Sequence, residues 1–537
     1  MNSKVKKSFF EKYEFIIPLA LFILFLIFTL PGISWGAPDT WHPDEIVLRS
    51  IKALHGEWKF SEINFDYPDL PQYAMFWLGK TILALGKTDK DVLIASRVLS
   101  AVLAGLTVAL TYLITRRISN NIHAAGLGGL LLICVSEMSH NGRFAHNDTY
   151  VTFFVALAIL FLINYKTSNQ TGWLYASFIA VGMAASSKYN GISLVIAPAL
   201  IYIASRKRDL FDLRTLETLF IGGVLTFLGF AFGTPKALTW MVYYFKRMIP
   251  ALLHTGNYLR QPDSVRGYLG QYGSFFQGVG LPLFILFVLA LGWTCYKVYR
   301  VYIVKQEQRD ARSDFLVILL LAIFALDIPV LVSYNYPMRF FLPMLSLFAI
   351  LGALFVAELY RHEQYRKVLS VALTVVVLFS LARNISVMLL FQNDARISAS
   401  RYLETLPLGT SLEHTYYPPS IPAGHFEREF SYPIYFRKAT DEPLPTNKSY
   451  KFNAGEIGLV ERKTDYLVVD SFTTDKFDNA YTCADMQVEC DFFKQLATGQ
   501  STHYKLIAEF LYTLPAYLPQ IDITFVNPSI RVYERIK

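Results

Sequence analysis

Two adjacent carboxylates, Asp44 and Glu45, follow the first apolar run of the chain in the stretch "WHPDEIVLRS". A carboxylate in such a place can take a proton from a hydroxyl group that attacks a substrate. Its neighbour can bind the attacking group, or adjust the acidity of the first carboxyl through repulsion between like charges. The pair therefore predicts acid–base chemistry. The competing interpretation is that both acids are the solvated flank of a loop.

Three cations, Arg143, Lys188 and Arg339, stand apart from the clusters that hold most of the Lys and Arg residues. A phosphate group held near them would explain their positions, because guanidinium and ammonium groups bind phosphate oxygens strongly. Each could instead be an anchor whose side chain reaches lipid headgroups. Asp148, in "NDTY", either supports the same site or caps the helix that begins there.

His146, Tyr67 and Tyr189 stand beside acids or cations in the chain and complete the candidate site. Histidine together with carboxylate suits divalent metal ions. His42 and His140 are two further histidines that could act as ligands. Their spacing matches no familiar set of metal ligands. A divalent metal is thus a cofactor that these side chains could hold, and no cofactor is certain from the sequence.

The elements that must position these residues are apolar. Of the 537 residues, 53% are hydrophobic and only 17% are charged, whereas a typical soluble domain has about 25% charged residues. The apolar residues gather in eleven runs, some of them shorter than the roughly 20 residues of a full membrane span. The chain is therefore predicted to be a polytopic α-helical membrane protein with about eleven transmembrane helices. The runs lie at 15–33, 92–115, 122–138, 149–165, 172–187, 190–205, 216–234, 280–296, 314–333, 340–358 and 368–390.

The net charge of +8 does not indicate a nucleic-acid partner, because Lys and Arg lie in short clusters between the apolar runs, as membrane topology requires. The first run, 15–33, is longer than the roughly 7–15-residue apolar part of a signal peptide and lacks a clear cleavage site, so we expect a retained anchor. With a cytoplasmic N-terminus, the basic clusters fall on the cytoplasmic side. An odd number of spans then places the C-terminal region outside the cytosol, in a multi-pass protein of the cell membrane.

Two domains are predicted. Residues 1–390 form the transmembrane domain, whose first outer loop, 36–91, contains two amphipathic segments typical of helices that lie in the membrane interface. Residues 391–537 are polar, with proline-rich turns and short β-like runs, and are predicted to form an extracytoplasmic α/β domain. In that domain Cys483 and Cys490 could pair in an oxidising compartment or remain as two thiols.

Several motifs occur in an order that resembles the GT-C glycosyltransferases. They are "HPDE" after the first span, "NGRFAHNDTYVTFF" at the fourth, "SSKYNG" between later spans and "RFFLPMLSLFAILGA" in the tenth. More narrowly, the set is similar to the protein O-mannosyltransferases and the lipid A aminoarabinose transferases of bacterial or archaeal type. The C-terminal stretches "ASRYLETLPLGTSLEHTYYPP" and "NPSIRVYER" resemble the extracytoplasmic tail of such proteins. The resemblance covers most of the chain, and its specificity lies in the order of the motifs.

The resemblance implies a membrane glycosyltransferase that takes a sugar from a polyprenyl-phosphate donor, dolichyl or undecaprenyl. The acceptor would be a protein, lipid or glycan outside the cytosol. Asp44 and Glu45 match the catalytic acids of the family, and Asp44 would act as general base in an inverting displacement. "FDYPDLPQY" resembles the family's Pro-Pro-Leu segment, but Asp69 replaces the second proline, so the resemblance assigns no role to Asp69.

The remaining matches concern the departing lipid phosphate and the residues around it. Arg143, Lys188 and Arg339 are expected to bind that phosphate, and Asp148 matches the acid of the second motif. His146, Tyr67 and Tyr189 are expected to support the site.

Two alternatives involve no glycosyl transfer. A secondary transporter of a polar or anionic solute would usually show repeated halves and polar groups near the membrane midplane. Here no repeat is visible, and the polar groups gather at one face. A scaffold or receptor, in which residues 391–537 bind a partner, would leave the acids of the first loop and the three outer cations unexplained.

Overall fold

The protein is represented by a computed structural model, which describes residues 14–60, 65, 67–206, 212–257, 270–331, 338–430, 459, 463–485 and 487–536. The chain forms two compact units. Unit 1 comprises Met1–Ile33 and Asp44–Ile385, and unit 2 comprises Ser34–Pro43 and Ser386–Lys537.

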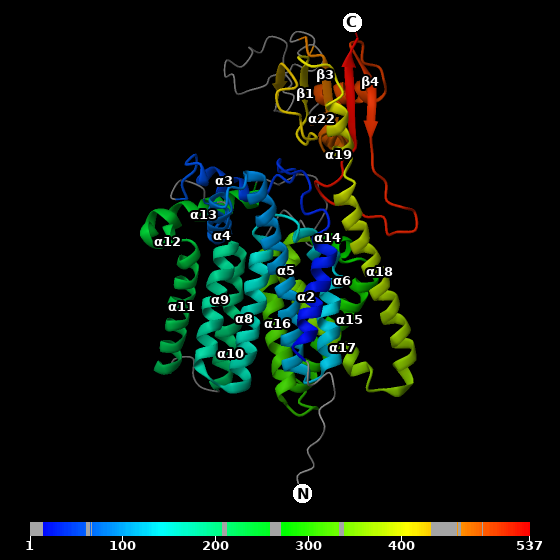
Figure 1. The fold of residues 1–537 in the computed structure, drawn as a ribbon. Helices are drawn as coiled ribbons and strands as arrows, with labels where there is room; N and C mark the ends of the chain where they lie inside the picture. Colours follow the sequence, from blue (N-terminus) through cyan, green and yellow to red (C-terminus); the bar gives the residue numbers. More distant parts are fainter. Residues whose placement is uncertain are drawn as a thin grey trace. The chain divides into compact units, whose positions relative to one another are not determined.

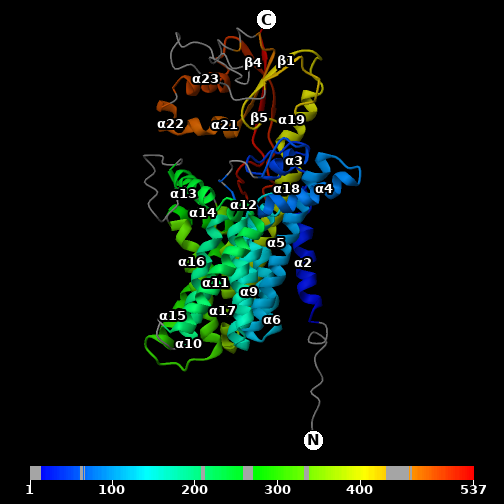
Figure 2. The ribbon, with the colours of Figure 1, turned by 90° about the vertical axis from the view of Figure 1, so that its left-hand side faces the viewer.

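Unit 1 is a bundle of helices whose axes run roughly parallel, as the two views in Figures 1 and 2 show. Apolar side chains from nearly all of these helices meet in one large buried core. The bundle helices are α2 (Ile16–Thr29), α5 (Asp89–Ser119), α6 (Ile122–Cys134), α8 (Asp148–Ser168), α9 (Thr171–Ser187), α10 (Ile196–Arg206), α11 (Leu213–Gly233), α15 (Leu281–Tyr302), α16 (Ala311–Leu331), α17 (Leu342–Leu359) and α18 (Arg366–Gln392).

In the part of the chain that the structure describes, each predicted apolar run falls on one or two helices, so the predicted polytopic helical architecture is confirmed. In the described part of the chain, 7 helices are long and apolar enough to cross a membrane, and Ile16–Thr29, Ile122–Cys134 and Tyr189–Ser205 are shorter apolar helices. The count of eleven spans therefore stays a prediction.

Shorter helices connect the bundle helices. The two amphipathic segments of the first loop form α3 (Val47–Leu54) and α4 (Leu70–Ala84), at one end of the bundle together with α12 (Lys236–Thr239) and α13 (Met241–Asn257) (Figure 1). Trp77 on α4 is 59% exposed, as is typical of an aromatic ring at a membrane interface. The other short elements are α7 (Ser136–Asn141), η1 (Tyr189–Val195), α14 (Gly270–Val279), η2 (Met338–Phe341) and η3 (Glu363–Tyr365).

Helices α9 and α11 pack with their backbones almost in contact. A Cβ atom added at Gly182 would lie 2.1 Å from the carbonyl oxygen of Thr226, and one added at Gly229 would lie 2.5 Å from that of Ile179. Small residues at such a crossing allow close helix approach in membranes. The crossing matters for the site because α9 ends immediately before Lys188 and α11 ends shortly before Lys236.

Unit 2 contains the predicted α/β domain. Its five strands have the order β2-β1-β3-β5-β4. Strand β1 is parallel to β2 and β3, whereas β5 is antiparallel to β3 and β4. Val468 on the fully buried strand β3 lies opposite Val532 on β5. The elements are α19 (Ala395–Leu403), β1 (Ser411–His414), β2 (Arg428–Phe430), β3 (Tyr466–Asp470), α21 (Ser471–Thr474), η4 (Asp475–Asp478), α22 (Ala480–Asp485), α23 (Gln487–Ala497), β4 (Tyr504–Phe510) and β5 (Ile530–Arg535).

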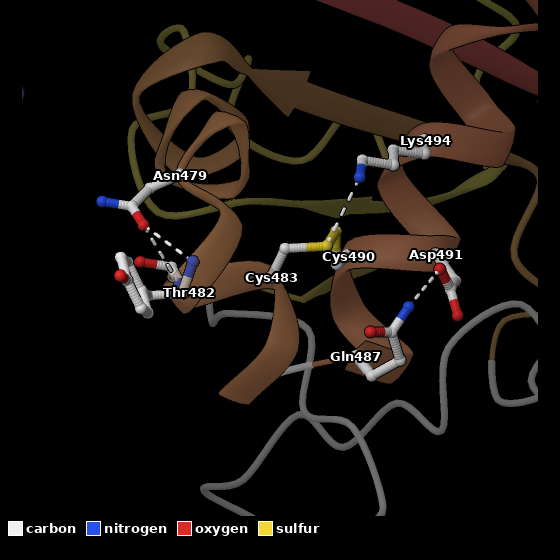
Figure 3. Close-up of a disulfide and its surroundings, with 8 residues drawn as sticks. Asn479, Thr482, Cys483, Gln487, Cys490, Asp491 and Lys494 are labelled. Carbon is white, nitrogen blue, oxygen red and sulfur yellow. Dashed lines mark hydrogen bonds between the residues drawn. A yellow bond between two sulfur atoms is a disulfide. The ribbon is translucent and has the colours of Figure 1, made fainter.

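Cys483 on α22 and Cys490 on α23 form a disulfide, with their Cα atoms 5.2 Å apart (Figure 3). Of the two alternatives that the sequence left open, the structure contains the bonded pair. The ammonium group of Lys494, one turn after Cys490, donates a hydrogen bond of 3.4 Å to the Cys483 sulfur. The disulfide therefore joins two short helices that flank the sheet.

Residues 34–43 belong to unit 2. The sequence did not indicate this, because the prediction placed these residues in the first domain, with its outer loop beginning at residue 36. The indole of Trp35 donates a hydrogen bond of 2.9 Å to Asp394. The Arg396 guanidinium lies 5.0 Å from the ring centre of Trp35 and 4.4 Å from that of Trp41. The chain returns to unit 1 at Asp44, which is the first candidate residue.

Candidate active site

Asp44 and Arg339 form an ion pair across a sequence separation of 295 residues, with 2.5 Å between Arg339 Nη1 and Asp44 Oδ2. Asp44 lies in the turn before α3, and Arg339 lies in η2, immediately before α17. The side chains are 28% and 20% exposed, respectively. The structure thus brings the predicted base and one predicted phosphate-binding cation together, at a place that solvent reaches.

Asp148 contacts two of the other predicted residues. Lys188 Nζ lies 2.5 Å from Asp148 Oδ1, and His146 Nδ1 lies 2.7 Å from Oδ2. Asp148 begins α8, where the helix dipole favours an acid, and Lys188 follows the last residue of α9. Burial lowers the pKa of Lys188, and the charge of Arg339 acts in the same direction, while Asp148 opposes both. Because the charge of Arg339 affects the pKa of Lys188, the Asp44–Arg339 and Asp148–Lys188 ion pairs are neighbours.

Tyr67 connects the two ion pairs. Its ring packs edge to face on His146, with the ring centres 5.9 Å apart. Tyr67 also interacts electrostatically with Asp44, Arg339 and Asp148. Burial, together with Asp44, raises the pKa of Tyr67 to about 12, so its hydroxyl remains a hydrogen-bond donor at neutral pH. Asp44, Arg339, Asp148, Lys188, His146 and Tyr67 therefore form one group, hereafter the charged cluster.

Glu45 has a different environment from Asp44. Its two carboxylate oxygens accept hydrogen bonds of 2.7 Å each from Nε and Nη2 of Arg97, and both side chains are 0% exposed. The Ala145 amide donates another, at 3.0 Å. The loop that carries Asp44 is thereby fixed to α5 and to the segment before α8. Because both oxygens are engaged, the geometry gives Glu45 a positioning role, and its expected roles beside Asp44, to bind the acceptor or to adjust the acidity of Asp44, stay predictions.

Arg143 is buried, and its hydrogen bonds hold the end of α2. Its Nη1 donates to the Ser139 carbonyl at 2.6 Å and its Nε to that of Pro31 at 3.2 Å, and its Nη2 donates to the Phe28 carbonyl. Such contacts satisfy carbonyl groups that a helix end leaves without intrahelical partners. These contacts give Arg143 a structural role, and its expected binding of a lipid phosphate stays a prediction.

A second polar group lies next to the charged cluster and contains the remaining predicted residue, Tyr189. The hydroxyl groups of Tyr189 and Tyr244 are 2.7 Å apart. Asp69 and Lys236 form a buried ion pair, with 2.9 Å between Lys236 Nζ and Asp69 Oδ1. The Asp69 amide donates to the Thr234 hydroxyl at 3.2 Å. Burial raises the pKa of Asp69 to about 6, although Lys236 opposes the shift.

Several residues of this region were missed by the sequence analysis. Arg97 carried a usable signal, because a single cation inside an apolar run usually has a buried partner or a function. Asp69 stood out only as the residue that replaces a proline of the family's segment, with no role assigned, and Lys236 gave no comparable signal, because it stands in a polar connecting segment. Arg49, whose guanidinium lies 5.6 Å from the Tyr67 ring centre, looked like an ordinary residue of an amphipathic helix.

A divalent metal ion would need several ligand side chains close together. Within the described ranges, no three His, Cys, Asp or Glu side chains converge as ligands for a metal ion. In the charged cluster, Asp148 contacts an ammonium group and an imidazole. A divalent metal thus stays an untested expectation.

The chain matches known proteins in sequence. Residues 64–249 match the family model described as dolichyl-phosphate-mannose-protein mannosyltransferase. An undecaprenyl phosphate-alpha-4-amino-4-deoxy-L-arabinose arabinosyl transferase 1 of Pseudomonas fluorescens strain Pf-5 is 27% identical over 233 residues, which is 41% of this chain and 40% of the relative. Its counterpart in strain Pf0-1 is 29% identical over 196 residues, or 34% of this chain and 32% of the relative. The chain spans less than half the length of these curated relatives.

The fold also matches solved structures. The archaeal oligosaccharyltransferase AglB from Archaeoglobus fulgidus, solved with an inhibitory peptide and a dolichol-phosphate, gives a TM-score of 0.51 at 13% identity, with 99% of this chain and 89% of that chain covered. ArnT from Cupriavidus metallidurans in the apo state gives 0.50 at 11% identity, with 97% and 98% covered. The predicted resemblance is therefore confirmed: the chain is similar to GT-C glycosyltransferases of the protein O-mannosyltransferase and aminoarabinose transferase group.

Proposed function

We propose that this protein is a membrane glycosyltransferase that moves a sugar from a polyprenyl-phosphate donor to an acceptor outside the cytosol. The observation that carries the proposal is the Asp44–Arg339 ion pair, 2.5 Å long, beside the Asp148–Lys188 pair. A base and a cation that solvent reaches, beside a second cation that is largely buried, are what a transfer reaction with a phosphate leaving group requires. The family match and the curated relatives point to the same chemistry and do not favour a transporter.

In the proposed reaction, Asp44 takes the proton of an acceptor hydroxyl or amine as that group attacks the anomeric carbon of the sugar. The bond from the anomeric carbon to the phosphate oxygen breaks, and its electron pair leaves with the lipid phosphate. Attack opposite to the leaving group inverts the anomeric centre, and the transition state resembles an oxocarbenium ion. A positioned base contributes typically 10²–10⁴-fold to the rate.

Arg339 and Lys188 are the proposed ligands of the donor phosphate. Both are paired with carboxylates, so an incoming phosphate competes with Asp44 for Arg339 and with Asp148 for Lys188. If Arg339 turns toward the phosphate, the Oδ2 oxygen of Asp44 becomes available to an acceptor. Donor binding would then prepare the base for the acceptor. Positioned electrostatic groups of this kind are commonly worth about 10²–10³-fold in rate.

The orientation of the protein is part of the proposal. The Cys483–Cys490 disulfide supports an extracytoplasmic unit 2, because structural disulfides persist in oxidising compartments. With a cytoplasmic N-terminus, the reaction would take place at the outer face of the cell membrane. Protein, lipid and glycan acceptors all fit this arrangement.

The test uses membranes that contain the full-length protein and a polyprenyl phosphate with a labelled sugar. Label should leave the lipid donor with the wild type and stay on it with Asp44→Asn. The receiving fraction, whether protein, lipid or glycan, identifies the acceptor class. If a folded wild-type protein moved no label from any such donor, the proposed function would be wrong.

A further inference from the structure

The Asp69–Lys236 pair lies next to the charged cluster, because two short chain segments contribute side chains to both. In the first, Tyr67 packs on His146, whereas Asp69, two residues later, binds Lys236. In the second, Lys188 binds Asp148, whereas Tyr189 meets Tyr244. Each segment thus contributes one side chain to the charged cluster and one to the second polar group. The two groups are therefore connected through neighbouring residues of the same two segments.

One oxygen of Asp69 lacks a partner. Asp69 Oδ1 accepts from Lys236, but Oδ2 is buried and accepts no hydrogen bond in the described part of the chain. The Asp69 side chain is only 3% exposed. A buried polar atom without a hydrogen bond carries a substantial free-energy cost, so this oxygen is suited to accept a hydrogen bond from a bound ligand.

Aromatic rings surround the pair. Lys236 Nζ lies 5.5 Å from the ring centre of Phe65 and 5.9 Å from that of Tyr244. Phe65, Phe230 and Tyr244 belong to one small apolar cluster, on which Tyr189 packs. Sites for small ligands combine such walls with a few convergent polar groups that fix the ligand's orientation. Here those groups are a carboxylate oxygen, an ammonium group and two tyrosine hydroxyls.

The charges around Asp69 bear on which ligands this site could bind. The single negative charge of Asp69 is already balanced by Lys236, and Arg49 adds a further positive field at Asp69. A ligand ammonium group would gain one contact with Asp69 and meet repulsion from both cations. A sugar hydroxyl could donate to Asp69 Oδ2, and a neighbouring hydroxyl could accept from Lys236.

We infer that Asp69 and Lys236 recognise hydroxyl groups of the donor sugar and select a neutral sugar over an aminosugar. This inference rests on the proposed function and narrows its substrate class. It favours a donor of the kind named in the matching family model, a dolichyl-phosphate mannose, over the aminodeoxyarabinose donor named for the curated relatives.

The experiment compares three lipids of the same polyprenyl length in membranes with the full chain: the phosphate with mannose, with 4-amino-4-deoxy-L-arabinose and with no sugar. Binding is measured by competition, and transfer is measured with labelled sugar. The variants are Asp69→Asn and Lys236→Met. Asp89→Asn is the matched control, because Asp89 also pairs with a basic residue of the first loop, His55, but is 47% exposed.

The wild type should bind the mannose lipid more tightly than the aminosugar lipid. Asp69→Asn and Lys236→Met should each weaken mannose-lipid binding roughly 10- to 100-fold, the usual loss for a hydrogen bond to a charged group. Binding of the sugar-free lipid phosphate should stay unchanged, as should all three affinities in Asp89→Asn. The preference for mannose should therefore shrink only in the two variants of the pair.

Two results would overturn the inference. One is an unchanged sugar preference in both variants; the other is an equal loss for all three lipids, which would indicate a purely structural pair. Failure of the proposed function would look different: the wild type would bind the mannose lipid in an Asp69-dependent way and yet transfer no sugar. If Asp69→Asn does not fold, Lys236→Met still tests the inference, because it changes the other residue of the pair.

Discussion

Arg339 donates its hydrogen bond to the same carboxylate that we propose as the base, since Nη1 lies 2.5 Å from Asp44 Oδ2. A guanidinium that serves both the base and the leaving phosphate can make the order of substrate binding part of the mechanism. Donor phosphate would draw Arg339 away, and only then would Asp44 accept a proton from the acceptor.

Asp44→Asn should lower the transfer rate by at least about 10²-fold, because an amide cannot take the acceptor proton. Labelled-sugar transfer in membranes, normalised to the amount of folded protein, measures the effect. Asp39→Asn, an acid of the preceding segment, serves as the control and should transfer normally. Near-normal turnover of Asp44→Asn would remove Asp44 from the role of base.

Arg339→Gln should lower kcat/KM for the donor by roughly 10²–10³-fold, because the phosphate loses a cation in the transition state. In the double variant with Asp44→Asn, the two losses should not add, since the residues act as a unit. A double-mutant cycle on kcat/KM tests this directly. Strictly additive losses would show that Arg339 and Asp44 work independently.

Glu45→Gln should destabilise the protein by about 3–5 kcal/mol, because it leaves Arg97 buried without its charge partner. Replacing both residues, by Glu45→Leu and Arg97→Met, should recover part of that loss. Thermal unfolding in detergent gives the comparison. If Glu45→Gln kept its Tm and lost only transfer, Glu45 would belong to the catalytic machinery after all.

The Asp69 carboxyl is expected to make the stability of the folded protein depend on pH. Its pKa is raised to about 6 by burial, against the charges of Lys236 and Arg49, whereas an unfolded chain has about 3.9. Between roughly pH 4 and pH 6 the folded state holds the proton more tightly, so stability falls as pH rises through this window. The loss is at most about 3 kcal/mol.

Tm of the detergent-solubilised protein between pH 4 and pH 7 measures that dependence. Asp69→Asn should flatten the curve in this window. Burial, together with the charge of Asp69, raises the pKa of Tyr73, so Tyr73 stays neutral between pH 4 and pH 7 and should not contribute to the curve. A slope that persisted in Asp69→Asn would assign the pH dependence to another group.

Reduction of the Cys483–Cys490 disulfide should destabilise unit 2 by about 2 kcal/mol, since a short loop loses its constraint in the unfolded state. In intact cells, a membrane-impermeant thiol reagent should label these cysteines only after an external reductant is added. Cys483→Ser/Cys490→Ser provides the background. Labelling that required opened cells would place unit 2 on the cytoplasmic side.

The sequence was sufficient to predict the helices, because long apolar runs have few alternatives in a membrane. The motifs quoted from the sequence also contain most residues of the charged cluster. Which acid met which cation could not be predicted. Asp44 and Glu45 are adjacent in the chain, yet one pairs with Arg339 and the other with Arg97.

The reason is geometric. Neighbouring side chains on a loop point in different directions, and a partner 52 or 295 residues away is chosen by tertiary packing. The same holds for Arg143, whose contacts with the carbonyl groups of Phe28 and Pro31 could not be predicted from its isolated charge. The grouping of residues 34–43 with unit 2 depends on Trp35 and Trp41, whose rings contact Arg396. No local sequence pattern predicts these contacts.

The glycine crossing between α9 and α11 has a consequence for substrate choice. Lys188 follows one of these helices and Lys236 follows the other, so the distance between the proposed phosphate ligand and the proposed sugar ligand depends on how closely the two helices approach. Gly182 and Gly229 set that approach. An alanine at either position would push the helices apart and lengthen the span between the two lysines. Under the proposed function, residues buried in the bundle would thereby determine which size of sugar fits between the two lysines.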